Sequence, residues 1–436
     1  MPITLDQRDK GFEAAFTAFL STKREVSEDV DKIVRDIIAN VRAKGDAAVL
    51  AYTKQFDRLD LTADSMRVTP EEIKAAYTSA SKTTVEALRL AKTRIENHHL
   101  RQLPKDDRYT DAIGVELGSR WTSIDSVGLY VPGGTASYPS SVLMNAVPAK
   151  VAGVERVVMV VPSPDGKLNP LVLVAADIAG VSEIYRIGGA QAIAALAYGT
   201  KTIAQVVKIV GPGNAYVAAA KRRVFGTVGI DMIAGPSEVL VIADKENNPD
   251  WIAADLLAQA EHDVAAQSIL ITDDVDFAFA VEEAIGRQLV TLERGDIASQ
   301  SWEDFGGIIL VNSIDDAVPI VNRLAAEHVE LAIADPEALL PKIRNAGAIF
   351  LGAYTPEVIG DYIAGSNHIL PTARSSRFSS GLSVMDFVKR TSILKLGVEQ
   401  LRALAPAAME LAKAEGLGAH KRSVAMRLNV NARNDG

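Results

Sequence analysis

The sequence of 436 residues contains no cysteine and only six histidines. Without thiols the chain can form no disulfide, iron–sulfur or copper–thiolate centre, and any redox chemistry must proceed without a cysteine nucleophile. A metal ion would have to be held by imidazole, carboxylate, carbonyl or water, which favours Zn²⁺ or Mn²⁺. The histidines and their neighbours are therefore the first candidates for a functional site.

Long hydrophobic runs and an excess of basic residues are also missing. No apolar stretch approaches the roughly 20 residues that a membrane span needs, and the net charge is −9. Nucleic acid and anionic membranes require a basic surface, so we expect neither as a partner and favour a small-molecule substrate. The N-terminal segment lacks the apolar core of a secretory signal, and its acidic residues argue against a transit peptide; this predicts a cytoplasmic protein.

Short Val- and Ile-rich runs alternate with Ala-rich segments over most of the chain. Val127–Val131 and Val206–Val210 are expected strands of one such stretch, and Val239–Ala243 and Ser268–Thr272 of a second. This alternation is typical of βαβ units that build a parallel sheet. The predicted fold class is α/β, with two Rossmann-like, incomplete, doubly wound βαβ modules and helical N- and C-terminal extensions.

Three glycine-rich turns follow expected strands of the first module: Val131-Pro-Gly-Gly134, Ile187-Gly-Gly-Ala-Gln191 and Val210-Gly-Pro-Gly-Asn214. The last two lead directly into helices, whose N-terminal N–H groups bind phosphate. None matches G-x-G-x-x-G, and glycine that merely permits a tight turn is an equal alternative. The amides of Gln191 and Asn214 slightly favour a cofactor site, because they stand where a cofactor could be hydrogen-bonded.

Four histidines stand beside carboxylates or amides or next to glycine. Gln259 and His262 are three residues apart at the end of an expected helix, which puts both on one face. Asp361 and His420 could complete a set of four nitrogen and oxygen ligands, although positions so distant in sequence need not meet. For Gln259 or His262 alone, a satisfied polar group in the core or on the surface is the favoured alternative.

Glu327-His328 stands between an expected helix and an expected strand. Imidazole suits proton transfer near neutral pH, and a neighbouring carboxylate can activate water or hold an imidazolium. A histidine stabilised by the helix dipole, beside an exposed glutamate, explains the pair equally well. His368 lies in an irregular stretch typical of a binding loop. A simple turn accounts for Ser237, and helix capping for Glu415.

Taken in order, these segments resemble the histidinol dehydrogenase family. The resemblance rests on Tyr130-Val-Pro-Gly-Gly, Asp231-Met-Ile-Ala-Gly-Pro-Ser-Glu-Val, Leu257-Ala-Gln-Ala-Glu-His-Asp, Ala326-Glu-His-Val-Glu-Leu, Asp361-Tyr-Ile-Ala-Gly-Ser-Asn-His-Ile-Leu-Pro-Thr and Glu415-Gly-Leu-Gly-Ala-His, together with the Gln191 and Asn214 turns. The match covers nearly the whole chain in one collinear order, which is far more specific than any single motif.

The resemblance implies oxidation of L-histidinol to L-histidine through L-histidinal in two NAD-dependent steps, which end histidine biosynthesis. Zn²⁺ would anchor the substrate, and Glu327 and His328 would be catalytic. The implied zinc ligands are Gln259, His262, Asp361 and His420. The implied substrate contacts are these four together with Ser237, His328, His368 and Glu415, and the implied cofactor contacts are Tyr130, Gln191 and Asn214.

The implied mechanism agrees with the composition. His328 would take the hydroxyl proton as hydride leaves, and Glu327 would activate water to form the gem-diol that His328 deprotonates in the second step. Aldehyde oxidation commonly uses a cysteine thiohemiacetal, which this chain cannot form. A hydrated aldehyde is the remaining route.

The resemblance also sets the expected division of the chain. It implies a homodimer in which Glu415 and His420 complete the partner's active site. The expected parts are an N-terminal helical extension (1–25), a catalytic and metal-binding α/β domain (26–107 and 238–382), a Rossmann-like NAD-binding domain (126–236) and a C-terminal helical dimerisation segment (383–436).

Three alternatives remain. The first is a paralogous zinc and NAD dehydrogenase of another amino alcohol or a sulfonate, against which the presence of Ser237, His368 and Glu415 counts. The second is a metal hydrolase in which Glu327 or His328 activates zinc-bound water. The third is a non-catalytic binding or assembly protein, whose function would not depend on Glu327 and His328.

Overall fold

The structure is a computed structural model that describes residues 2–21, 28–133, 138–233 and 235–429. Gly134 of the first glycine-rich turn and the expected domain boundary at residues 25 and 26 lie outside these ranges. The chain forms two compact units: Met1–Gln102 with Ile124–Phe387, and Leu103–Ser123 with Val388–Gly436. Each unit is described by itself.

The first unit contains a five-stranded parallel sheet in the order β6-β5-β4-β7-β8. Its strands are almost wholly apolar because helices cover both faces. The chain reverses its direction of winding between β4 and β7, where doubly wound sheets form a crevice. The strands are β4 (Ser126–Tyr130), β5 (Arg156–Val160), β6 (Glu183–Tyr185), β7 (Lys208–Val210) and β8 (Gly229–Ile230).

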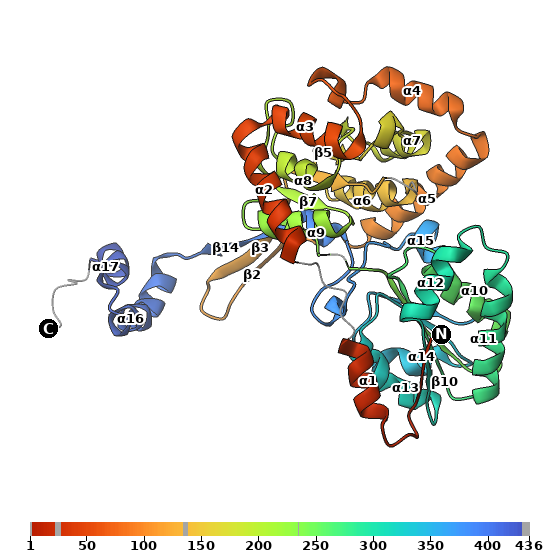
Figure 1. Ribbon diagram of the computed structural model, residues 1–436. Coiled ribbons are helices and arrows are strands. Elements are labelled where there is room, and N and C mark those ends of the chain that lie inside the picture. The colour runs from red at the N-terminus through yellow and green to blue at the C-terminus, as the bar shows by residue number, and fades with distance from the viewer. Residues whose placement is uncertain (1, 22–27, 134–137, 234, 430–436) are drawn as a thin grey trace. The chain divides into compact units, whose positions relative to one another are not determined.

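Eight helices pack on this sheet. On one face lie α4 (Pro70–Ser79), α5 (Lys82–Leu100), α6 (Pro139–Val151) and α7 (Pro170–Ala179), and on the other α2 (Glu28–Lys44), α3 (Asp46–Asp57), α8 (Gly189–Tyr198) and α9 (Ala215–Val224). Figure 1 shows these helices gathered around β5 and β7. Helices α2 to α5 share their apolar cores with the five-stranded sheet, and they lie in the same compact unit as residues 238–382. The expected division of this unit into domains stays a prediction.

A six-stranded parallel sheet in the order β1-β11-β10-β9-β12-β13 forms the rest of this unit's framework. When β1 is left out, the other five strands lie in the order β11-β10-β9-β12-β13. In both sheets the first strand along the chain is in the centre, with the second and third on one side of it and the fourth and fifth on the other. The change of winding in this sheet therefore falls between β9 and β12. The strands are β1 (Ile3–Asp6), β9 (Glu238–Ala243), β10 (Gln267–Thr272), β11 (Gly307–Leu310), β12 (His328–Ala332) and β13 (Ala348–Leu351). The N-terminal segment therefore contributes a strand as well as a helix.

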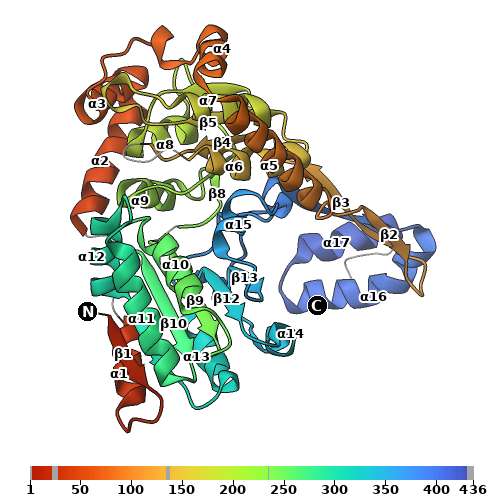
Figure 2. The same ribbon diagram turned by 90° about the vertical axis from the view of Figure 1, so that its right-hand side faces the viewer.

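Helices cover both faces of this sheet as well. α1 (Phe12–Ser21) and α13 (Ala317–Leu324) pack on one face, and α10 (Pro249–Ala260), α11 (Val275–Leu289) and α12 (Gly295–Phe305) on the other, as Figure 2 shows for α10 and α11. The shorter helical elements are η1 (Asp64–Met66), η2 (Pro164–Gly166), η3 (Ile314–Asp316), α14 (Pro336–Leu339), η4 (Leu340–Lys342), α15 (Glu357–Tyr362), η5 (Ser375–Arg377) and η6 (Val384–Phe387).

The second unit is a three-stranded antiparallel sheet followed by two helices. The elements are β2 (Asp107–Thr110), β3 (Glu116–Ser123), β14 (Val388–Lys395), α16 (Val398–Ala414) and α17 (Gly418–Arg427), and the strand order is β14-β3-β2. The sequence predicted helical structure from about residue 383, whereas the structure places a strand at 388–395. Among all the described residues, no helix has both the length and the apolar character needed to cross a membrane.

Candidate active site

His328 and Glu327 lie at the amino ends of β9 and β12, where the winding of the six-stranded sheet changes. The backbone of Glu238, the first residue of β9, holds both side chains. The Nδ1–H of His328 donates to the carbonyl oxygen of Glu238 at 3.1 Å, and the backbone N–H of Glu238 donates to Glu327 Oε2 at 3.0 Å. Within the described chain, His328 Nε2 has no hydrogen-bond partner. The imidazole is therefore fixed through one nitrogen, and the other is left for chemistry.

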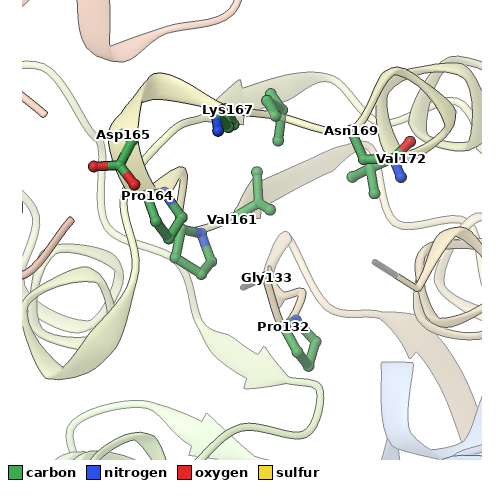
Figure 3. Close-up of a pocket in the computed structure, with 10 residues that line it drawn as sticks. Pro132, Gly133, Val161, Pro164, Asp165, Lys167, Asn169 and Val172 are labelled. Carbon is green, nitrogen blue, oxygen red and sulfur yellow. The ribbon is translucent and has the colours of Figure 1, made fainter. Parts of the chain in front are cut away.

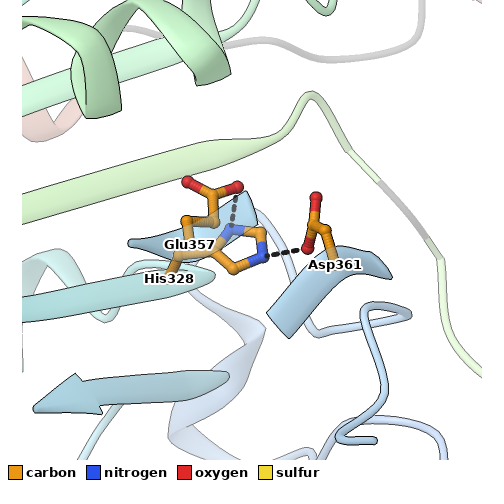
Figure 4. Close-up of side chains that lie close together, drawn as sticks. All are labelled: His328, Glu357 and Asp361. Atoms are coloured by element: carbon orange, nitrogen blue, oxygen red, sulfur yellow. Dashed lines mark ion pairs between the residues drawn. The ribbon is translucent and has the colours of Figure 1, made fainter. Parts of the chain in front are cut away.

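Two carboxylates of α15 flank the same imidazole. Glu357 Oε1 is 3.4 Å from His328 Nδ1, and Asp361 Oδ1 is 3.7 Å from His328 Nε2 (Figure 4). Glu357 and Asp361 are four residues apart, which places them on one face of the short helix. We call His328, Glu327, Glu357 and Asp361 the His328 cluster.

Burial and mutual charge set the protonation of this cluster. Burial alone would lower the pKa of His328, but the carboxylates of Glu357, Glu327 and Asp361 raise it well above its usual value. Burial raises the pKa of Glu327 to about 7 and that of Glu357 to about 8. Carboxyl groups that exchange protons near neutral pH suit general acid–base work.

Two further acids lie behind the cluster. Glu330 Oε1 on β12 accepts the backbone N–H of Glu357 at 2.8 Å, and the Glu330 side chain also hydrogen-bonds that of Asp255 on α10. Burial raises the pKa of Asp255 to about 6, and burial together with the neighbouring acids raises that of Glu330 well above its usual value. Glu330, Glu357 and Asp255 were not predicted from the sequence. A charged residue inside the apolar strand that follows His328 was the available signal for Glu330.

Gln259 is the clearest candidate metal ligand. It lies in the last turn of α10 with 0% of its surface exposed, and in the described structure neither its Oε1 nor its Nε2 has a hydrogen-bond partner. A buried amide without partners costs about 1–3 kcal/mol. Such a cost is retained where the group binds something else, such as an ion or a substrate.

His262 and Asp361 are the other two expected ligands in this unit. Part of the His262 surface is open to solvent, yet protein surrounds the imidazole closely enough that burial lowers its pKa, against the pull of Asp361. Burial favours the neutral form of Asp361, but its ion pair with His328, at 3.7 Å, and the charges of His368 and His262 lower its pKa overall. A neutral imidazole, an ionised carboxylate and an amide oxygen are suitable ligands for Zn²⁺.

His368 joins the loop after α15 to helix α6, which packs on the five-stranded sheet. Its Nδ1 donates to the carbonyl oxygen of Asp361 at 3.0 Å, and its Nε2 lies 3.1 Å from Ser141 Oγ on α6. Burial lowers the pKa of His368. Ser237 is half-buried and directly precedes Glu238, whose backbone binds Glu327 and His328. Ser141 was not predicted from the sequence.

The three expected cofactor residues lie beyond the carboxyl ends of strands in the five-stranded sheet. Tyr130 ends β4, and its hydroxyl oxygen accepts the N–H of Gly189, the first residue of α8, at 3.1 Å. Gln191 is buried in the same helix, and its Oε1 is without a hydrogen-bond partner in the described residues. Asn214 is exposed and caps α9, where its side chain accepts from two backbone N–H groups.

A cavity of about 320 Å³ opens beyond the carboxyl ends of β4 and β5 (Figure 3). Its walls include the rings of Pro132, Pro162 and Pro164, and Lys167 and the Asn169 cap of α7 add polar groups. It lies at the same edge of the sheet as Tyr130. An apolar wall with a few polar groups is typical of a small-molecule site.

Glu415 and His420 belong to the second unit. Glu415 ends α16 and His420 lies in the first turn of α17, and both are exposed. The first unit therefore contains three of the four expected zinc ligands.

The fold and the site define an α/β enzyme: two parallel sheets of one winding order, with a buried histidine–carboxylate cluster at the change of winding in one and a glycine-rich edge in the other. A family model described as histidinol dehydrogenase matches residues 20–428. The chain belongs to the histidinol dehydrogenase family.

Individual relatives agree with this assignment. The histidinol dehydrogenase of Brucella abortus (strain 2308) is 72% identical over 430 residues, which cover 99% of this chain and 100% of that protein. The enzyme of Mesorhizobium japonicum is also 72% identical over 430 residues, 99% of this chain and 100% of that protein. The crystal structure of histidinol dehydrogenase from Elizabethkingia anophelis is similar with a TM-score of 0.93 at 37% identity, and 98% of each chain is covered.

Proposed function

We propose that this protein oxidises L-histidinol to L-histidine through L-histidinal in two successive NAD-dependent steps, the last of histidine biosynthesis. Membership of the family supports histidinol oxidation in that pathway. The observation that carries the two-step proposal is the anchoring of Glu327 and His328 to the backbone of one residue, Glu238, with the Nε2 of His328 left without a hydrogen-bond partner among the described residues.

The two side chains divide the proton transfers. When the carboxylates that raise its pKa are neutralised, His328 takes the hydroxyl proton of histidinol at Nε2 in the first step, and the carbonyl of Glu238 keeps the ring in the required tautomer. Glu327 then takes a proton from the water that adds to the aldehyde, for which a pKa of about 7 is suited, while His328 returns its proton to the aldehyde oxygen. His328, neutral again, deprotonates the resulting gem-diol in the second step. NAD, when bound, supplies the acceptor for both hydrides.

Zn²⁺, when bound, anchors the substrate and neutralises carboxylate charge. Gln259, His262 and Asp361 would hold it in the first unit, with His420 as the fourth ligand. The buried and unpartnered amide of Gln259 supports this assignment, because without a ligand both of its polar atoms are unsatisfied. Besides these four ligands, Ser237, His328, His368 and Glu415 would contact the substrate.

The cofactor would bind along the carboxyl edge of the five-stranded sheet. Tyr130, Gln191 and Asn214 lie at that edge, and the unpartnered oxygen of Gln191 is available to a ligand. The change of winding between β4 and β7 supports the location, because ligands of doubly wound sheets bind at such points.

The fourth ligand requires a homodimer in this proposal. The C-terminal segment with Glu415 and His420 would complete the active site of the partner subunit. Exposed apolar side chains in the second unit support a partner, because large apolar surfaces left open to water are typical of interaction sites. They are Leu103, Tyr109, Ile113, Leu394, Val398, Leu404, Leu411, Leu417 and Met426.

A stoichiometric assay tests the proposal. We expect two NADH for each histidinol consumed, with activity lost on chelation and restored by Zn²⁺. Glu327→Gln should impair mainly histidinal oxidation, and His328→Ala both steps, each by roughly 10²-fold or more. Glu337→Gln, an exposed glutamate of α14, is the control.

Other outcomes identify the alternatives. Equal loss of both steps in Glu327→Gln would contradict its role in hydration. NADH formed from another amino alcohol but not from histidinol would identify a paralogue. No NADH from any alcohol would favour a hydrolase, and a function that survives both substitutions would indicate a binding protein.

A further inference from the structure

A fully buried ion pair lies beneath the turn between β7 and α9. Lys221 of α9 and Asp231, which follows β8, form an ion pair with side chains only 2% and 1% exposed. Removing two charges from water largely offsets their attraction, so a buried pair is weak support for stability alone. The contacts that the pair makes with neighbouring residues are therefore more informative than the pair itself.

Both members of the pair bind the same residue. The Gly211 N–H donates to Asp231 Oδ2 at 2.7 Å, and Lys221 Nζ donates to the Gly211 carbonyl oxygen at 2.9 Å. Charge-assisted hydrogen bonds are stronger than neutral ones and fix geometry more closely. The peptide groups on both sides of Gly211 are therefore held from two directions; we call this arrangement the Lys221–Asp231 clamp.

Gly211 could not be held in this way if it were another residue. Its φ of 108° lies in the region that favours glycine, and a Cβ would stand 2.1 Å from the carbonyl oxygen of Tyr130. The turn is thus pressed against the end of β4. A displacement of Gly211 would move the backbone at Tyr130 or open the contact between β4 and β7.

The clamp connects all the elements at the change of winding. Gly211 directly follows β7, Asp231 directly follows β8, and Lys221 lies in the helix that Asn214 caps. Tyr130 and Asn214 are residues proposed above to contact NAD. Pre-formed sites bind more tightly because less ordering is needed on binding.

We propose that the Lys221–Asp231 clamp is a positioning device for the cofactor, which holds the Gly211–Asn214 turn against Tyr130 in the geometry that binds NAD. The inference rests on the proposed function. Neither charged group touches the cofactor. Both act through the backbone of Gly211.

Lys221→Met and the double variant Lys221→Met/Asp231→Asn test the clamp. Met leaves the Gly211 carbonyl without its charged donor, whereas Asn retains an acceptor for the Gly211 N–H without leaving an unpaired buried charge. We expect the Kd and KM for NAD to rise about tenfold, the effect of losing one hydrogen bond to a charged group. The KM for histidinol should change less than about twofold, and the double variant should retain a cooperative thermal transition.

The ion pair between Arg156 and Glu183 provides the matched control. It is also largely buried, with side chains 25% and 18% exposed, but it lies at the opposite, amino ends of β5 and β6. Arg156→Met/Glu183→Gln should lower the melting temperature without changing the KM for NAD. A rise in KM for NAD equal to that of the clamp variants would indicate general loosening of the sheet and overturn the inference.

A measurement on the unaltered protein keeps the test decisive even if the variants do not fold. Without NAD, the Gly211 amide hydrogen should exchange as slowly as those in the centre of β7, because its acceptor is a buried carboxylate. Exchange at the rate of an open loop, or an unchanged Kd for NAD in a folded double variant, would contradict the clamp. Failure of the proposed function is distinct from this, because wild-type protein would then form no NADH from histidinol.

Discussion

Unsatisfied polar atoms mark the active site more sharply than charge does. Gln259, His328 Nε2 and Glu357 Oε2 all lie buried without hydrogen-bond partners among the described residues. They come from α10, β12 and α15, and two acids of α15, Glu357 and Asp361, flank the imidazole of His328. A folded chain satisfies most buried polar groups, so several exceptions in neighbouring elements indicate groups kept for a ligand.

Gln259→Leu should separate this ligand role from stability. Leucine fills a similar volume without polar atoms. The free energy of unfolding of the metal-free variant should therefore be about 1–3 kcal/mol higher than that of the metal-free wild type. Purified variant protein should bind less zinc and oxidise histidinol slowly. Calorimetry of chelated samples measures the change in stability. Atomic absorption measures the zinc content. A variant that is less stable without metal and retains wild-type zinc would show that Gln259 is structural.

At the scale of elements, the parallel strands could be predicted and the antiparallel ones could not. β9 reads Glu-Val-Leu-Val-Ile-Ala and is buried throughout, so its apolar run is visible in the sequence. β2 is exposed along its length, and β14 is exposed or half-buried at every position. Strands without a buried face carry no hydrophobic period, and pattern reading has nothing to detect there.

The candidate site shows the same limit. Glu327 and His328 were candidates because an adjacent acid and imidazole form a recognisable pair, but only the family resemblance implied that they are catalytic. Glu357 begins a helix of six residues and has no neighbour of that kind in the sequence. Only the pairing of β9 with β12, and the placement of α15 beside them, brings it to 3.4 Å from His328. Contacts between distant segments depend on topology, which the local sequence does not encode.

The acids that join α10, β12 and α15 should make stability depend on pH. Asp255 and Glu330 bind a proton more tightly in the folded state than at their ordinary values of 3.8 and 4.5. Their stabilising contribution is therefore complete below about pH 4 and is lost as pH rises through about 6 and beyond. The melting temperature of metal-free protein should fall between about pH 5 and about pH 8.

Glu330→Gln should weaken this dependence. Glutamine keeps an acceptor for the Glu357 N–H but cannot ionise, so the fall in melting temperature over the same range should be smaller than in wild type. Differential scanning calorimetry at both ends of the range measures the difference. Glu337→Gln, on the surface of α14, is the control and should follow wild type. An unchanged slope in Glu330→Gln would mean that the Asp255–Glu330 pair does not govern it.

On the scale of the whole molecule, one winding order is used twice and for different purposes. The five-stranded sheet presents Tyr130 and the Gly211 turn at its carboxyl edge, whereas the six-stranded sheet presents Glu238 and His328 at its amino edge. The contact between His368 and Ser141 joins the loop after α15 to α6, a helix of the five-stranded sheet. Hydride transfer requires cofactor and substrate to meet, and under the proposed function each sheet would supply the residues for one of them.

The second unit raises the question of which subunit uses its Glu415 and His420. Few of its side chains are buried, among them Ala405, Ala412 and Ala425 in its helices, so its helices have little core of their own. If a partner's site uses them, two inactive variants should complement each other. A heterodimer of His328→Ala and His420→Ala subunits would contain one site with both residues intact and one with neither.

Co-expression of the two variants should therefore restore about a quarter of wild-type activity, because half of the randomly assembled dimers are mixed and each has one intact site. Each variant alone should be inactive. The assay is NADH formation by the unfractionated mixture, and mixed dimers purified from it through two different affinity tags should have about half of wild-type activity. If each subunit used its own His420, every site in the mixture would lack one residue, and activity would stay at the level of the single variants.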